Sequence, residues 1–103
     1  MTEAQLQDAV VELARLLHWR LYHTFDSRRS SAGFPDLVMV RSGRLLFAEL
    51  KSSVGIKSQS QEAWLYDLEV AASMKEGRGW ACPEVYVWRP ESWSSGEIER
   101  VLR

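Results

Sequence analysis

The sequence predicts an α/β protein in which helices pack on the faces of a mixed β-sheet. Apolar residues recur at helical spacing near the start of the chain and again after residue 58, and short apolar runs typical of strands fill the segments between and after them. The expected order of elements is α-β-β-β-α-β-α, which suits a sheet flanked by helices. With 103 residues, 46% of them hydrophobic and 26% charged, the chain fits one globular domain, 1–103.

The first helix is expected over residues 3–18. Thr2, followed three residues later by Gln5, has the pattern of a capping box at a helix start. Four apolar residues then form one stripe at helical spacing, namely Leu6, Val10, Leu13 and Leu17. The aromatic-rich segment 19–25 predicts the first strand, and the polar segment 26–34 predicts a loop.

Two apolar runs, 37–40 and 45–50, are expected to form a β-hairpin. Ser42 and Gly43 between them suit a two-residue turn. This turn places Asp36 opposite Glu49, with Lys51 on the same face. A three-residue turn would put the two acids on opposite faces. Because the runs are apolar at alternate and adjacent positions alike, we expect central strands covered on both faces.

A second helix is expected from Ser58, with Gln61 in the capping-box position. Its predicted buried face consists of Trp64, Leu65, Leu68, Ala71 and Ala72. The helix should fray near 75–79, where two glycines occur, and residues 85–88 predict the last strand. Ser94 and Glu97 predict a third capping box, which would open a short terminal helix.

Composition excludes several classes of protein. No apolar run approaches the ~20 residues of a membrane span, and the N-terminal segment is acidic and polar, unlike a signal peptide. Cys82 is the single cysteine, so an intrachain disulfide and a cysteine zinc cluster are excluded and a reducing, cytoplasmic setting is expected. Residues 19–57 hold seven basic and three acidic residues, which suits either a polyanionic partner or an ordinary solvated loop and hairpin.

The expected hairpin gathers two carboxylates and an ammonium group at one end of its strands. Adjacent carboxylates repel, and a hard divalent cation such as Mg²⁺ relieves that repulsion while keeping positions for phosphate oxygens. Lys51 could then orient or deprotonate a water molecule, or offset charge on the phosphate. The alternative is a salt-bridged strand end in which Lys51 neutralises both acids. Spacing alone leaves both interpretations open.

Gly33-Phe34-Pro35-Asp36-Leu37, a hairpin, and then Glu49-Leu50-Lys51-Ser52 resemble the PD-(D/E)XK nuclease motif. More narrowly, the chain resembles the small stand-alone VRR-NUC nucleases, which are related to Holliday-junction resolvases. The likeness covers nearly the whole chain and includes His23, Thr24, Ser27, Arg28, Arg29, Gln61, Trp64, Leu65 and the segment 85–90. It implies a restriction-endonuclease-like αβββαβ core with a short C-terminal helix.

The resemblance also implies an activity, a cofactor and partners. The activity is that of a Mg²⁺- or Mn²⁺-dependent endodeoxyribonuclease, which hydrolyses phosphodiester bonds in DNA. A homodimer is implied, in a bacterial or phage-infected cell. Asp36 and Glu49 would be metal ligands together with the carbonyl of Leu50, and Lys51 would be the catalytic lysine. Gln61 would lie near the metal or the scissile phosphate, although the sequence supports its capping role at least as well.

The family places a further carboxylate of the first helix near the metal. Helical geometry favours Glu3, about 60° from the apolar stripe, over Glu12 and Asp8, which lie farther round the helix. Glu3 has an alternative role as an acid in the first turn of a helix. Loop residues that can contact DNA phosphates are Ser27, Arg28, Arg29, Ser30 and Ser31. His23 could contact a phosphate or assist proton transfer, or be a structural histidine.

The absence of some motifs bears on the kind of DNA that is bound and on the competing functions. No recognition helix or zinc finger accompanies the motif, so we expect selection of branched DNA, such as a Holliday junction or flap. The segment 72–83 is longer than the usual family link. One alternative is a catalytically silent nucleic-acid-binding or assembly module on the same fold. A metal-dependent nucleotide hydrolase is a third hypothesis, but the sequence has no Gly-rich phosphate loop to support it.

Overall fold

The computed structural model describes residues 1–24, 31–73 and 83–103. The elements follow in the order α1 (Glu3–Leu16), β1 (Arg20–His23), β2 (Leu37–Arg41), β3 (Arg44–Leu50), α2 (Gln59–Ser73), β4 (Glu84–Trp88), α3 (Pro90–Ser94) and α4 (Glu97–Leu102). The predicted order is therefore confirmed, with two short helices in place of one at the C-terminal end. The expected end of the second helix near 75–79 lies outside the described residues.

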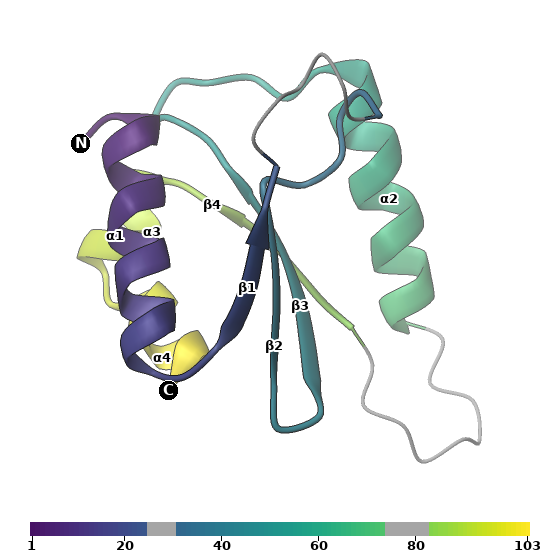
Figure 1. Ribbon diagram of the computed structural model, residues 1–103. Helices are drawn as coiled ribbons and strands as arrows, with labels where there is room; N and C mark the ends of the chain where they lie inside the picture. Colours follow the sequence, from purple (N-terminus) through teal and green to yellow (C-terminus); the bar gives the residue numbers. More distant parts are fainter. Residues whose placement is uncertain (25–30, 74–82) are drawn as a thin grey trace.

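A four-stranded mixed sheet forms the centre of the protein. Its strand order is β1-β2-β3-β4, with antiparallel pairing up to β3 and parallel pairing between β3 and β4. Helices flank it as expected, with α1, α3 and α4 on one side and α2 on the other (Figure 1). None of the helices in the described ranges is long and apolar enough to span a membrane.

The β2–β3 hairpin has the register that a two-residue turn predicts. Ser42 and Gly43 both have positive φ, of 48° and 82°, as a type I′ turn requires. The strands pair from Arg41 with Arg44 up to Leu37 with Ala48. Asp36 and Glu49 are the next residues along the two strands. They therefore lie at the end of the sheet remote from the turn, on one face.

The main core lies between the sheet and α1, α3 and α4. The predicted capping box opens α1, since Gln5 N–H donates to Thr2 Oγ1 (3.1 Å) and Thr2 N–H to Gln5 Oε1 (2.8 Å). Fully buried side chains from the sheet, α1 and α4 meet there, and the partly buried Trp93 of α3 packs against them. The buried set includes Leu6, Val10, Leu37, Met39, Leu46, Leu50, Trp88, Ile98 and Leu102. The helix ends at Leu16, two residues earlier than expected, and His18 turns the chain with a φ of 67°.

The other face of the sheet is covered less than the sequence suggested. Of the five residues predicted to be buried on α2, only Leu65 is, and Ala71 is exposed. Tyr22 and Val40, which the register places on this face, are 61% and 42% exposed. The predicted central position of β2 and β3 is therefore confirmed, but their cover on the second face is only partial. One helix about 10 Å wide spans roughly two strands spaced about 4.8 Å apart.

The C-terminal helices begin at other residues than predicted. Pro90 starts α3 directly after β4, and Arg89 N–H donates to Ser92 Oγ (3.1 Å). Ser94 therefore lies inside α3, and α4 begins after Gly96, whose φ is 83°. The Ser94–Glu97 capping box was a wrong prediction. A proline suits the first position of a helix, and a left-handed glycine ends the short helix before the next one starts.

Candidate functional site

Asp36 and Glu49 come together where β2 begins and β3 ends. Asp36, half-buried, accepts a hydrogen bond from the backbone N–H of Leu50 at its Oδ2 (2.8 Å). Glu49 is only 1% exposed. The N-terminal ends of α1 and α2 lie at this same end of the sheet (Figure 1). The hairpin therefore brings two carboxylates to one place, as the turn length predicted.

The Glu49 carboxyl is buried without full hydrogen bonding. Its Oε1 accepts a long bond from Gln61 Nε2 (3.5 Å), while its Oε2 is buried and has no hydrogen-bond partner among the described residues. Burial, with the neighbouring Asp36, raises the pKa of Glu49 to about 9, a rise that Lys51 opposes and Glu3 supports. Burial and the neighbouring Asp36 carboxyl thus both disfavour a negative charge on Glu49 when no cation balances it.

Gln61 caps α2, as the sequence predicted, and also reaches the Glu49 carboxyl. Its backbone N–H donates to Ser58 Oγ (3.2 Å) and its Oε1 accepts from Ser58 N–H (2.9 Å), which completes the predicted capping box at the start of α2. The other end of the same amide, Nε2, points to Glu49. Capping thus fixes the amide in the orientation that presents its donor to the buried carboxylate.

Gly33 lets the chain approach α2 closely just before Asp36. Its φ is +85°, and a Cβ there would lie 2.3 Å from the carbonyl carbon of Ser60. Phe34 then packs edge-on against Phe47 and Trp64, with ring centroids 6.2 and 5.1 Å apart. Gly33 and Phe34 therefore pack α2 against the chain that enters β2, next to Asp36. The sequence predicted that this segment is constrained, but not that it packs against α2.

Lys51 is half-buried beside Glu49 and is held through its backbone. Its N–H donates to Trp88 O (3.0 Å), which continues the parallel pairing of β3 with β4. Arg89, one residue further on, donates from one guanidinium nitrogen to Ser52 O (2.6 Å) and Gly55 O (2.8 Å). Arg89 thereby fixes the chain that follows Lys51. The sequence did not indicate this part for Arg89, because an arginine after a strand is ordinarily solvated.

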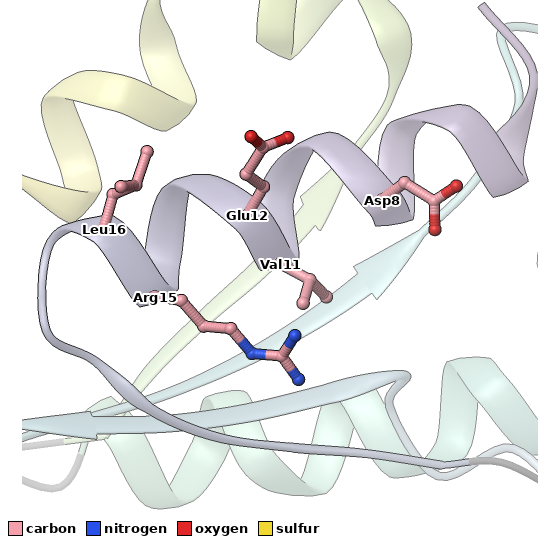
Figure 2. A pocket seen from close by; sticks show the side chains of 5 residues that line it. All are labelled: Asp8, Val11, Glu12, Arg15 and Leu16. Carbon is pink, nitrogen blue, oxygen red and sulfur yellow. The ribbon is translucent and has the colours of Figure 1, made fainter.

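Of the acids on α1, Glu3 is the one that acts on the site. It is exposed in the first helical turn and raises the pKa of Glu49. Asp8 and Glu12 instead border a surface pocket with Val11, Arg15 and Leu16 (Figure 2). All five side chains come from the one helix, and none of them belongs to the predicted site. The helical ranking of Glu3 above Asp8 and Glu12 agrees with this arrangement.

Not all of the other predicted site residues lie next to the two acids. The backbone N–H of Leu50 donates to Asp36, and the role of the Leu50 carbonyl as a metal ligand stays a prediction. His23 pairs with Leu37 and so points to the face opposite Asp36, whereas Thr24 N–H donates to Asp36 O (3.0 Å). The predicted DNA contacts Ser27, Arg28, Arg29 and Ser30 fall in 25–30, outside the described residues. Thr24 is a neighbour of the site that the sequence did not single out for chemistry.

The donor set fits a hard divalent cation in part. Asp36 and Glu49 provide carboxylate oxygens, and the unpartnered Oε2 of Glu49 is an acceptor that a cation would satisfy. No group of three or more His, Cys, Asp or Glu side chains suited to a metal occurs within residues 1–24, 31–73 and 83–103. Two carboxylates suffice for Mg²⁺, which keeps several water ligands.

No family model, no curated protein and no solved structure matches the chain. The roles of these residues therefore rest on the sequence and the structure alone.

Proposed function

We propose that the protein is a divalent-metal-dependent DNA endonuclease of the VRR-NUC type, with the restriction-endonuclease-like core that its element order allows. The observation that carries this proposal is the buried Glu49 carboxyl, with Oε2 unpartnered and Asp36 beside it. An unsatisfied buried acceptor typically costs about 1–3 kcal/mol. A Mg²⁺ or Mn²⁺ ion held by the two acids would remove this cost and balance their negative charge.

The side chains around the acids have separable tasks. The Leu50 N–H holds the Asp36 carboxylate, and Gln61 holds that of Glu49. When bound, a divalent cation supplies Lewis-acid stabilisation of the charge that develops on the phosphate. The Lys51 ammonium group, next to Glu49, donates to a phosphate oxygen or to the attacking water. Asp36, Glu49 and the Leu50 carbonyl would hold the cation, with Glu3 at the border of the site.

Branched DNA is the proposed substrate and a homodimer the proposed assembly. The largest dimension of the molecule is 41 Å, little more than one helical turn of a duplex, about 34–36 Å. A single copy therefore contacts a short stretch of DNA, and a two-fold dimer offers two sites to the strands of a junction. The cytoplasm is the proposed location.

The experiment compares labelled linear, flapped, splayed and four-way DNA in Mg²⁺, Mn²⁺ or EDTA. We expect cleavage of branched DNA in both metals and none in EDTA. Asp36→Asn and Glu49→Gln should each lower the rate more than about a hundredfold, since direct ligands matter at least as much as their supports. Glu12→Gln, which changes an exposed acid elsewhere on α1, is the matched control. Binding without cleavage by the unchanged protein would favour the catalytically silent module.

Lys51→Met separates chemistry from metal binding. An ammonium group is not a ligand for Mg²⁺, so we expect calorimetry to give metal binding close to that of the unchanged protein. Cleavage should fall at least about a hundredfold, as general acid–base and electrostatic contributions of this size predict. A loss of metal binding as severe as in Glu49→Gln would make Lys51 a structural neutraliser of the acids instead.

A further inference from the structure

Two aliphatic side chains project from the loop that joins the candidate site to α2. Val54 and Ile56 are each 88% exposed. The loop follows Lys51 and runs across the end of the sheet to the start of α2 (Figure 1). We call Val54 and Ile56 the apolar tip. Burying an aliphatic side chain of this size is worth roughly 1.5–3 kcal/mol, so the tip carries binding energy that the monomer leaves unused.

The tip is presented on an anchored turn. Gly55 N–H donates to Ser52 O (3.3 Å), which closes the turn, and Arg89 binds the carbonyls of both of these residues. On the other side, Ser53 hydrogen-bonds to Glu91 and holds the pKa of that carboxyl below its ordinary value. A loop fixed in this way loses little conformational entropy when it binds.

The charge around the tip favours a polyanion over a second copy of the chain. Lys51 and Lys57 flank the loop, and no acidic residue occurs between Glu49 and Glu62 in the sequence, so the loop stays net basic although Glu91 contacts it at Ser53. A two-fold contact between copies would bring identical basic loops together. Val54 is three residues from Lys51, at most about 10 Å along the chain, which is roughly three rises of 3.4 Å in one DNA strand. A phosphate held at the candidate site thus brings nucleobases within reach.

We propose that the apolar tip is a wedge that inserts between nucleobases beside the bound phosphate and unstacks them. Aliphatic side chains of DNA-bending proteins are known to unstack base steps in this manner. A branch point offers steps that are already open, so a wedge there favours branched over linear DNA. This inference rests on the proposed function and adds the element that would select the DNA structure.

The test uses junction DNA in which 2-aminopurine, an adenine analogue that fluoresces more when unstacked, replaces one base at the branch. Ca²⁺ takes the place of Mg²⁺ so that DNA is bound and not cut. We expect the unchanged protein to raise the fluorescence severalfold. Val54→Ser/Ile56→Ser should lose most of that rise and bind junctions roughly tenfold more weakly. Leu16→Ser/Val70→Ser, which removes two other exposed aliphatic side chains, should behave as the unchanged protein.

The outcomes distinguish the wedge from the nuclease. If Val54→Ser/Ile56→Ser keeps the full fluorescence rise, or if both double variants lose it equally, the wedge is wrong, whatever the cleavage assay shows. A shift of the monomer–dimer equilibrium in Val54→Ser/Ile56→Ser with unchanged fluorescence would make the tip a protein interface and overturn the proposal. Fluorescence that depends on the tip, in a protein that cuts no DNA in Mg²⁺ or Mn²⁺, would support the wedge and reject the nuclease.

Discussion

The two carboxylates of the candidate site differ in what they contribute to the folded chain. Asp36 accepts the Leu50 N–H, so it stabilises the strand end even without a cation. Glu49 is buried with one oxygen unpartnered and its pKa raised to about 9. Replacing Asp36 by alanine therefore removes a needed acceptor, whereas asparagine keeps one. For this reason Asp36→Asn and Glu49→Gln, rather than alanine variants, separate loss of activity from loss of folding.

Gly33 carries a strong prediction at the scale of one residue. Gly33→Ala places a Cβ 2.3 Å from Ser60 C at a φ of +85°, so backbone strain adds to overpacking. We expect a loss of about 3 kcal/mol in unfolding free energy and a melting temperature lower by more than about 10 °C. Gly43→Ala is the control, since its φ is +82° but nothing lies within 4 Å of the added Cβ. Equal losses in the two variants would show that the close approach to Ser60 contributes nothing.

At the scale of elements, the sequence predicted the hairpin far better than the helical cover. The register followed from Ser42-Gly43, because a two-residue turn leaves one pairing and this pairing opposes Asp36 to Glu49. The burial of α2 did not follow, since helical periodicity indicates which side is apolar but not how much sheet the helix meets. The role of Arg89 was equally hidden, because its partners Ser52 and Gly55 are backbone carbonyls 37 and 34 residues away in sequence.

An ion pair between β3 and β4 gives stability a pH dependence. Arg44 donates to both oxygens of Glu84 (2.8 and 2.7 Å), and the Tyr86 hydroxyl donates to Glu84 as well. These hydrogen bonds lower the pKa of Glu84, and the bond from Arg44 contributes most. A lowered folded-state pKa means that the stabilisation is present above the unfolded-state value. It is lost as pH falls through the folded-state value.

We therefore expect Glu84→Gln to cost up to about 1 kcal/mol at pH 7, because the pair is partly exposed and screened. The difference from the unchanged protein should shrink as the pH falls below about 4.5, the ordinary carboxyl value. Denaturant unfolding at several pH values measures it. Glu99→Gln, which breaks the more exposed pair with Arg103, should cost less at every pH. A Glu84→Gln deficit that is constant with pH would contradict the assignment.

Across the whole molecule, four of the described basic residues of the middle segment divide between two ends of the sheet. At the hairpin end, Arg41 and Arg44 lie over the Trp19 ring at 4.6 and 5.0 Å. They also bind Leu17 O and Glu84, so their charge serves the fold. The other end of the sheet holds Lys51 and the loop up to Lys57. The basic excess noted in the sequence is thus in part structural. The proposed DNA contact would draw on Lys51 and Lys57, together with Arg28 and Arg29, which lie outside the described residues.

The arginine pair in the segment before Asp36 gives a prediction for DNA binding by the whole molecule. Arg28 and Arg29 lie outside the described residues, and their place in the chain, a few residues before Asp36, is the ground for expecting them to bind phosphates. Arg28→Ala/Arg29→Ala should weaken binding of all DNA forms. The slope of log affinity against log salt should fall by roughly 0.7–0.9 for each phosphate that is no longer neutralised. Fluorescence anisotropy at several salt concentrations measures this slope.

The control for that measurement removes two positive charges elsewhere. Arg100→Ala/Arg103→Ala has the same net charge change, at exposed positions near the C-terminus. A general charge effect would lower affinity equally in both double variants, whereas direct phosphate binding lowers the slope in Arg28→Ala/Arg29→Ala alone. The alternative from the sequence is that these arginines pair with acids of a second copy. An unchanged slope with a larger monomer fraction in sedimentation would assign them to the dimer, because breaking an ion pair between copies releases no DNA counterions.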